Sequence, residues 1–342
     1  MQMKTRSLRN IEVSAIGMGC MGFSTAYGQI PTEEESIRLM RKAHEMGCTL
    51  YDTAEIYATY RNEDLVGKAL KPIRDEVVLC SKFSPKTLPG QEGIKGVKMS
   101  MDGVRSAVEA SLRRLQTDRL DLYYAHRVPQ ETDVEEMASW FGALIKEGKV
   151  LGWGVSEATA EQISKANAVT PLTAVQSEYS MMARQWESDV IPLCRELGIG
   201  FVAYSPMAGG LLSGKYTPGT EYKGDDIRRV ISRYKAENVI SNQPIIDLVK
   251  EYARAKQCTP AQISLAWVMK NNHIIPIPGM RSDSRIEENL GAADIVLSDE
   301  EYALLTGELN KLKVYGERTD TQISELGELR TKLYGGSGVH FK

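Results

Sequence analysis

The chain has 342 residues, a net charge of −3 at pH 7, 42% hydrophobic residues and 25% charged residues. This composition is typical of a globular protein with a sizeable core and excludes a disordered chain. The charge gives no reason to expect nucleic acid or an anionic membrane as a partner, and no apolar stretch approaches the roughly 18 residues that span a bilayer.

The N-terminal residues and the cysteines indicate the cellular compartment. Residues 1–10 are polar and basic without an apolar core, unlike a signal peptide. The five cysteines are odd in number, widely spaced and include no Cys-x-x-Cys pair. Such spacing is typical of free thiols in a reducing compartment and argues against a disulfide framework or a zinc site. We expect a cytoplasmic protein without a bound metal.

Near the N-terminus, Lys4–Arg6 and Glu12–Val13 flank Leu8-Arg9-Asn10 and predict a small β-hairpin. After it, short apolar runs alternate with longer segments of helical period. Eight of these runs are suited to buried parallel strands. They are Ala15–Met18, Thr49–Thr53, Val77–Lys82, Leu120–His126, Val150–Ser156, Ala174–Tyr179, Gly200–Ser205 and Ile274–Ile277.

The segments between the runs carry helix signals. Thr32 to Glu35 predicts a capping box, in which Glu35 reaches back to the N-cap, and this helix should end near Gly47. Thr259 to Gln262 predicts a second capping box, with proline at the first helical position. One helical face is formed by Val104, Ala107, Val108, Ser111, Leu112 and Leu115.

Eight strands joined by helical crossovers can close into a barrel or open into a doubly wound sheet. The strand number favours the barrel, and no change of composition suggests a linker. We therefore predict an α/β fold: a single-domain (β/α)8 TIM barrel over residues 1–342, with the N-terminal hairpin capping its bottom. A long loop, glycine-rich and charged, follows the seventh strand from Pro206 to Asn242. Loops of this length are usually functional, and we expect it to fold over a ligand.

The segment from Gly17 to Gly22 matches G-x-G-x-x-G, the fingerprint of dinucleotide-binding Rossmann folds. That fingerprint requires a helix that opens at the glycines and an acidic residue about 20 residues later. Here the predicted helix begins only near Thr32, and Asp52 comes too late. A tight glycine turn after the first strand is the better interpretation.

Ionisable residues end three successive predicted strands: Asp52, Lys82 and His126. Singly, each has an ordinary structural explanation, as a cap, an edge charge or a satisfied core histidine. In a parallel barrel, however, the C-terminal strand ends form the active site, and buried charges are costly unless paired. Tyr57 follows Asp52 closely enough to reach the same place. Their joint placement favours catalysis.

These four residue types suit carbonyl reduction. Hydride arriving at the carbonyl carbon builds negative charge on the oxygen, so a proton donor must lie there. An ammonium about 4 Å from a phenol favours the phenolate by up to about 4 kcal/mol at an effective dielectric of 20, less the opposing cost of desolvation, and so can draw the phenol pKa down toward neutrality. A carboxylate holds the ammonium charged, and a histidine supplies a second hydrogen bond to the oxygen.

The sequence resembles the aldo-keto reductase family over nearly its whole length. Residues 52–57 (Asp-Thr-Ala-Glu-Ile-Tyr) and 62–67 (Asn-Glu-Asp-Leu-Val-Gly) are similar to the family signature. Lys82 and His126 match the family lysine and histidine. The resemblance implies that Tyr57 is the general acid and that Lys82, held by Asp52, lowers its pKa. It also implies that His126 orients a small-molecule carbonyl substrate.

The resemblance further implies NADPH/NADP+ as the cofactor, extended across the barrel mouth without a Rossmann fold. Ser156 and Gln176 would hold the nicotinamide carboxamide, and Tyr204 would stack on its ring. Gly19 in the glycine turn is a further expected contact. The stretch expected along the pyrophosphate contains Ser205, Pro206, Met207, Gly209, Leu211, Gly214 and Lys215.

The run that begins near Gly279 resembles the family's adenosine-phosphate clamp. Arg281 and Ser282 would hold the 2′-phosphate, because a guanidinium matches phosphate oxygens. Arg285 would lie against the adenine, whose amino edge would meet Glu288 and Asn289. A capped surface helix with scattered charges would explain the same residues, but the position after the eighth strand favours the cofactor.

Two departures from the family pattern affect the cofactor. Glu157 replaces an asparagine that is common after Ser156, which puts one carboxamide contact in doubt. Ser282 stands where a second basic residue is common, which could soften the preference for NADPH. The substrate pocket is less defined: Met21, Phe23, Phe83 and Val128 could shape it or simply pack.

Two other functions compete with the carbonyl reductase. Some barrels of this family are regulatory subunits that bind the cofactor as redox sensors and turn over slowly. A barrel aldolase would use Lys82 to form a Schiff base, which requires a neutral amine. The expected pairing with Asp52 argues against the aldolase. The physiological substrate and the oligomeric state stay open.

Overall fold

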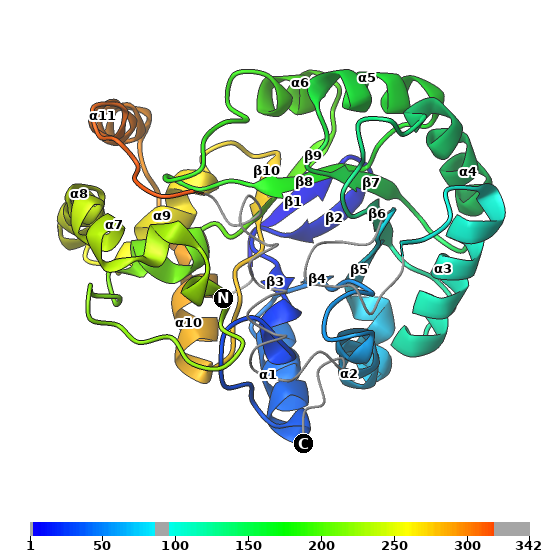
Figure 1. The fold of residues 1–342 in the computed structure, drawn as a ribbon, viewed down its shortest axis with the longest axis horizontal. Coiled ribbons are helices and arrows are strands. Elements are labelled where there is room, and N and C mark those ends of the chain that lie inside the picture. The colour runs from blue at the N-terminus through cyan, green and yellow to red at the C-terminus, as the bar shows by residue number, and fades with distance from the viewer. Residues whose placement is uncertain (1–2, 86–95, 318–342) are drawn as a thin grey trace.

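The computed structural model describes residues 3–85 and 96–317 and shows a barrel of parallel strands surrounded by helices (Figure 1). Eight strands form one sheet in chain order, and every neighbouring pair is parallel. The predicted α/β barrel is confirmed. The strands are β3 (Met18–Gly19), β4 (Leu50–Asp52), β5 (Val78–Phe83), β6 (Leu122–Ala125), β7 (Trp153–Ser156), β8 (Ala174–Glu178), β9 (Gly200–Tyr204) and β10 (Ile274–Pro276).

Two backbone hydrogen bonds join the first strand to the last at the barrel seam. The amide of Gly17 donates to the carbonyl of Pro276 at 3.0 Å, and that of Gly19 donates to Pro278 at 3.1 Å. A Cβ atom at Gly19 would lie 2.7 Å from the carbonyl oxygen of Ile277. These glycines therefore allow the close approach of two backbones. No long helix opens here, since α1 begins at Glu33, so the interpretation as a tight turn is confirmed.

The helices surround the sheet, and each contributes buried residues (Figure 1). Among the described residues, no helix is long and apolar enough to cross a membrane. The helices are α1 (Glu33–Glu45), α2 (Arg61–Leu70), α3 (Met101–Leu115), α4 (Val134–Lys146), α5 (Ala160–Val169), α6 (Val190–Glu196), α7 (Ala236–Ser241), α8 (Gln243–Ala255), α9 (Pro260–Val268), α10 (Asp283–Gly291) and α11 (Asp299–Asn310).

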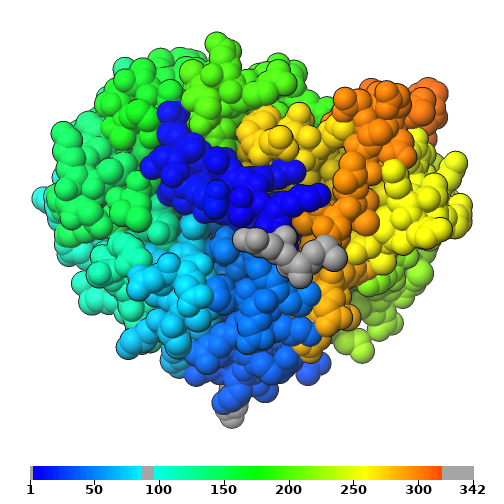
Figure 2. All heavy atoms as spheres, turned by 180° about the vertical axis from the view of Figure 1, so that it is seen from behind, coloured from blue at the N-terminus to red at the C-terminus, as the bar shows by residue number. Residues whose placement is uncertain are grey.

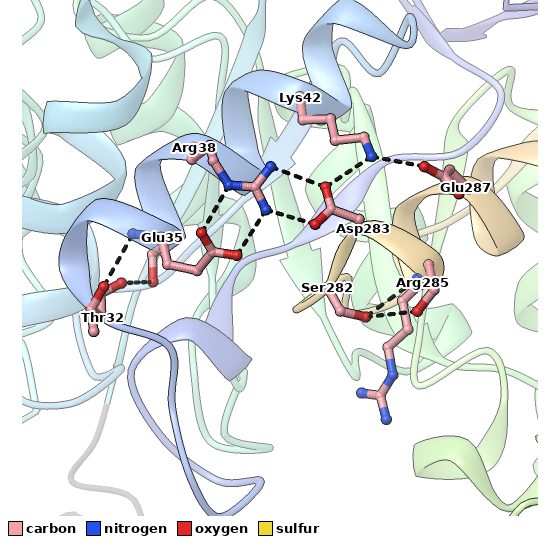
Figure 3. Close-up of polar contacts among 10 residues, drawn as sticks. Thr32, Glu35, Arg38, Lys42, Ser282, Asp283, Arg285 and Glu287 are labelled. Atoms are coloured by element: carbon pink, nitrogen blue, oxygen red, sulfur yellow. Dashed lines mark hydrogen bonds and ion pairs between the residues drawn. The ribbon is translucent and has the colours of Figure 1, made fainter.

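One of the two predicted capping boxes is wrong in part. At α9 the box is complete, because Thr259 and Gln262 each cap the other's backbone amide. At α1, Thr32 accepts from the amide of Glu35 as expected. The side chain of Glu35, however, does not reach back to Thr32. It turns along the helix to bind Arg38, since a guanidinium one turn away offers a charged partner (Figure 3).

The predicted hairpin closes the bottom of the barrel. Its strands are β1 (Thr5–Leu8) and β2 (Ile11–Ser14), which pair antiparallel. Figure 2 shows this N-terminal segment lying across the face opposite to that of Figure 1. Leu8 and Val13 are buried in a cluster with inward-facing strand residues, among them Leu50 and Val202. The hairpin thus seals the apolar barrel interior from water.

The long connection after β9 is confirmed, but it is not structureless. Between residues 206 and 242 it contains three short 3-10 helices and α7. It also meets the connection that follows β3: the amide of Ile227 donates to the carbonyl of Ala26 at 2.8 Å, and Thr25 donates to Asp225 at 3.2 Å. The two connections together border one side of the barrel mouth.

The seam gives a testable consequence for stability. A Cβ at position 17 would lie 2.8 Å from Leu50 Cδ2 and 3.0 Å from Ile277 Cγ2, so Gly17→Ala overpacks the seam. We expect a loss of about 1–3 kcal/mol in the free energy of unfolding, measured by urea denaturation. Gly219→Ala is the control, because no heavy atom lies within 4 Å of its added Cβ. Equal stability of the two variants would contradict this account of the seam.

Candidate active site

The four residues expected to be catalytic meet at the C-terminal end of the barrel. Asp52 is the last residue of β4, Lys82 lies in β5, and His126 directly follows β6. Tyr57 comes from the connection between β4 and α2. Lys82 is fully buried, and Asp52 and His126 are 3% and 6% exposed. Such burial requires that both charges be paired.

Lys82 is the centre of the arrangement. Its ammonium donates to Asp52 Oδ1 at 2.5 Å, to the carbonyl of Thr53 at 2.8 Å and to Tyr57 Oη at 3.2 Å. These three bonds use all three N–H groups of an ammonium. Asp52 is held from its other side, because Gln176 Nε2 donates to Oδ2 at 2.8 Å. The pair is therefore fixed in one geometry.

The backbone around Tyr57 places the phenol. The amide of Glu55 donates to the carbonyl of Lys82 at 3.1 Å, which ties this connection to β5. The three residues after Tyr57 have positive φ angles: Ala58 at 51°, Thr59 at 54° and Tyr60 at 72°. Side chains rarely adopt this conformation, and such strain concentrates at functional sites. The left-handed turn reverses the chain into α2 and leaves Tyr57 facing Lys82.

Burial and charge determine the protonation states. For Lys82, burial works against the charge, but Asp52 and Tyr57 together outweigh it and the pKa is raised, so the amine stays charged. Burial raises the pKa of Tyr57, and the opposing effect of Lys82 is smaller. Lys82 thus lowers the pKa of Tyr57 as expected, but the net pKa is raised and not drawn toward neutrality, because desolvation of the phenolate exceeds its attraction to the ammonium. Tyr57 keeps its proton at neutral pH.

His126 is also neutral. Burial first, and then the charges of Lys82 and Arg127, hold its pKa well below the usual value. Its ring meets that of Tyr57 edge-on, with centroids 5.8 Å apart. His126 Nδ1 has no hydrogen-bond partner among the described residues. A neutral imidazole beside a protonated phenol offers two hydrogen-bond donors to one acceptor.

Asp52, Tyr57 and His126 border a cavity of about 720 Å³. This volume suits a large ligand together with a small one. The wall contains most of the residues expected to bind the cofactor: Gly19, Gln176, Tyr204, Ser205, Pro206, Met207, Gly209, Lys215, Gly279, Arg281, Arg285, Glu288 and Asn289. Four expected residues lie outside the wall, namely Ser156, Leu211, Gly214 and Ser282.

Those four residues have structural partners. Ser156 is buried and accepts a hydrogen bond from Arg127. Leu211 packs in the core, and Gly214 ends a 3-10 helix at a φ of 68°. Ser282 is the N-cap of α10, where it accepts from the amide of Arg285. Among the candidate substrate residues, Met21 and Val128 line the cavity, whereas Phe23 and Phe83 are buried in the core.

Sequence reasoning missed Arg127, which lines the cavity next to His126. Its guanidinium donates to Ser156 Oγ at 2.9 Å and to Tyr204 Oη at 3.3 Å. Tyr204 in turn donates to Glu157 at 2.9 Å. Glu157, noted only as a departure from the family pattern, thus anchors the hydroxyl of Tyr204. An arginine directly after a predicted buried strand was the available signal.

A second group that was missed comes from the long connection. Arg228 is 9% exposed, pairs with Asp226 at 2.6 Å and lines the cavity. Its guanidinium lies 4.8 Å from the ring of Tyr216 and 5.4 Å from that of Tyr27. Arg281 donates to the carbonyl of Tyr27 at 3.1 Å. Loop sequence carries no periodic signal, so only the structure brings these side chains together.

The arrangement places two side chains at the cavity wall, the protonated phenol of Tyr57 and the neutral imidazole of His126. The charged Lys82 donates to the phenol oxygen. Among the described residues, no group of three or more His, Cys, Asp or Glu side chains could hold a metal ion. Proton transfer by Tyr57 to a substrate oxygen is the chemistry that this geometry serves best.

Comparisons with known proteins agree with this fold. A probable aldo-keto reductase 1 from Glycine max is 38% identical over 297 residues, which cover 86% of this chain and 84% of the relative. The holo form of the aldo-keto reductase AKR11C1 from Bacillus halodurans is similar with a TM-score of 0.74 at 27% identity, covering 92% of this chain and 98% of that one. An aldo/keto reductase from Klebsiella pneumoniae, solved in complex with NADP and acetate, has a TM-score of 0.69 at 29% identity. This match covers 94% of this chain and 99% of the Klebsiella chain.

The family model described as "Aldo/keto reductase family" matches residues 15–309, from the first strand through nearly all of α11. The resemblance expected from the signature residues is thereby confirmed, and the chain belongs to the aldo/keto reductase family.

Proposed function

We propose that this aldo/keto reductase uses NADPH to reduce an aldehyde or ketone to the alcohol, with Tyr57 as the general acid. The observation that carries the proposal is the Lys82 ammonium, which bonds to Asp52 and to Tyr57 Oη at 3.2 Å beside a large cavity. Aldo/keto reductases from Klebsiella pneumoniae were solved with NADP and with NADPH, which supports the choice of cofactor.

The residues present fit such a cofactor. The wall of one cavity contains Tyr57 and His126 together with Arg281 and Arg285 of the α10 region. Guanidinium groups match phosphate oxygens, and an aromatic ring such as that of Tyr204 matches a planar base. We propose that Gln176, which lines the cavity, holds the carboxamide, and that Ser205, Met207 and Lys215 follow the pyrophosphate.

NADPH, when bound, supplies a hydride to the carbonyl carbon. Tyr57 Oη donates its proton to the carbonyl oxygen as negative charge develops there, which leaves a phenolate. Lys82 stabilises that phenolate through its hydrogen bond to Oη, and Asp52 keeps the ammonium oriented. His126 donates a second hydrogen bond to the same oxygen. Since Tyr57 is protonated at rest, the reduction begins from the correct state.

The protonation of Lys82 counts against an aldolase. A Schiff base requires a neutral amine, whereas Asp52 raises the pKa of Lys82 despite full burial. All three N–H groups of Lys82 also donate hydrogen bonds, so the nitrogen has no lone pair available to attack a carbonyl carbon.

Replacing the proposed acid tests the assignment directly. We expect Tyr57→Phe to lower kcat for a reactive aromatic aldehyde by about 10²–10⁴-fold, because the proton donor is lost. NADPH binding, followed by quenching of protein fluorescence, should persist. Tyr60→Phe is the matched control, since Tyr60 lies three residues away and outside the cavity wall. Wild-type turnover by Tyr57→Phe would remove Tyr57 from the mechanism.

The pH dependence of reduction follows from two shifted groups. The active form carries the Tyr57 proton, so a raised pKa extends activity upward, and kcat/KM should fall only at alkaline pH. His126 stays neutral until well below its usual value of 6.5. We therefore expect a flat kcat/KM profile between about pH 6 and pH 9. An inflection near neutrality that disappears in His126→Gln would show that His126 is charged during turnover.

A further inference from the structure

An acidic residue stands in the middle of the basic run proposed to bind the cofactor phosphate. The order is Arg281, Ser282, Asp283, Ser284, Arg285. A carboxylate favours a helix N-terminus, but it repels a phosphate bound at the same place. Asp283 is the first residue of α10 and directly follows the N-cap Ser282. Phosphate binding therefore requires that the charge of Asp283 be removed or screened.

Two cations of α1 bind Asp283. Arg38 donates to both of its carboxylate oxygens, at 2.7 Å and 3.0 Å, and Lys42 Nζ lies 2.8 Å from Oδ1. These cations hold the pKa of the Asp283 carboxyl below its usual range. The contacts join helices that are 245 residues apart in sequence.

The contacts also orient the carboxylate. Figure 3 shows Asp283 directed at α1, while the guanidinium of Arg285 points the opposite way. The cavity wall agrees, because it contains Arg281 and Arg285 but not Asp283. The basic side chains of the run thus face the proposed cofactor site, and the acidic one faces away from it.

The network between α1 and α10 contains fewer cations than carboxylates. Arg38 also binds Glu35, and Lys42 also binds Glu287 at 2.7 Å, so two cations serve three carboxylates. Removing both cations would leave Glu35 of α1 and Asp283 and Glu287 of α10 without these partners, and Asp283 directly follows Ser282. Because the pairs are exposed, each contributes little to stability, and their main effect is on local charge.

We propose that Arg38 and Lys42 set the preference for NADPH over NADH by neutralising Asp283 and turning it away from the 2′-phosphate. The inference rests on the proposed function, because it concerns the same cofactor site. Arg38 and Lys42 are positioning residues that act through Asp283 and do not line the cavity.

The test is a binding measurement on the full chain, with NADPH and NADH titrated separately against protein fluorescence. We expect Arg38→Gln/Lys42→Gln to bind NADPH about fivefold more weakly, while the Kd for NADH, which lacks the 2′-phosphate, stays unchanged. Adding Asp283→Asn should restore NADPH affinity, because it removes the uncompensated carboxylate that directly follows Ser282. A purely structural role for the network would not be rescued by a third substitution in it.

Lys68→Gln is the control for charge loss alone, since Lys68 pairs with Glu33 in the first turn of α1 and touches no α10 residue. It should leave both affinities unchanged. Equal weakening of NADPH and NADH, or failure of Asp283→Asn to restore binding, would overturn the inference. So would wild-type protein that binds the two cofactors equally. The readout needs no turnover, so a failed aldehyde assay would reject the proposed reaction while the binding result still decides this inference.

Discussion

The site depends on one buried ion pair, that of Lys82 and Asp52. Removing two charges from water costs several kcal/mol per ion. The attraction between the two ions offsets this cost only when their geometry is good and further hydrogen bonds are formed. Here Thr53 and Gln176 supply those bonds. The two charges come from neighbouring strands, so the register of the sheet sets their separation. The barrel thereby provides a fixed cation under a phenol, which a loop alone would not hold in place.

Closure of the barrel brings the connections that follow β3 and β10 to the same mouth as the ion pair. The glycines at the seam let β3 approach β10, and the connections that follow these two strands then lie beside each other. As a result, Arg281 after β10 reaches the carbonyl of Tyr27 after β3. A motif that resembles a Rossmann fingerprint thus serves backbone packing. Its glycines are required because a Cβ at Gly19 would meet a carbonyl oxygen.

Much of this could be predicted from the sequence, because its signals are local. Short apolar runs that alternate with helical segments predicted the eight strands. Ionisable residues at three strand ends, with Tyr57 shortly after the first of them, predicted the four residues that meet at the mouth. The contact predicted for the Glu35 side chain was wrong because a capping box and an ion pair to Arg38 compete for one carboxylate. The lowering effect of Lys82 on the pKa of Tyr57 was predicted, because this pairing is visible in a motif. The net rise of that pKa was not, because desolvation depends on everything packed around the phenol.

The residues that were missed share a physical reason. Arg127 and Arg228 act through partners that are distant in sequence, such as Tyr204 and Tyr27, and no period or spacing encodes such pairs. The same holds for Asp283, whose charge contradicts its basic neighbours until α1 is placed against α10. Local sequence therefore determines which groups can react, since strand ends fix them. The cofactor preference proposed above depends instead on the charge balance between elements that only the closed barrel brings into contact.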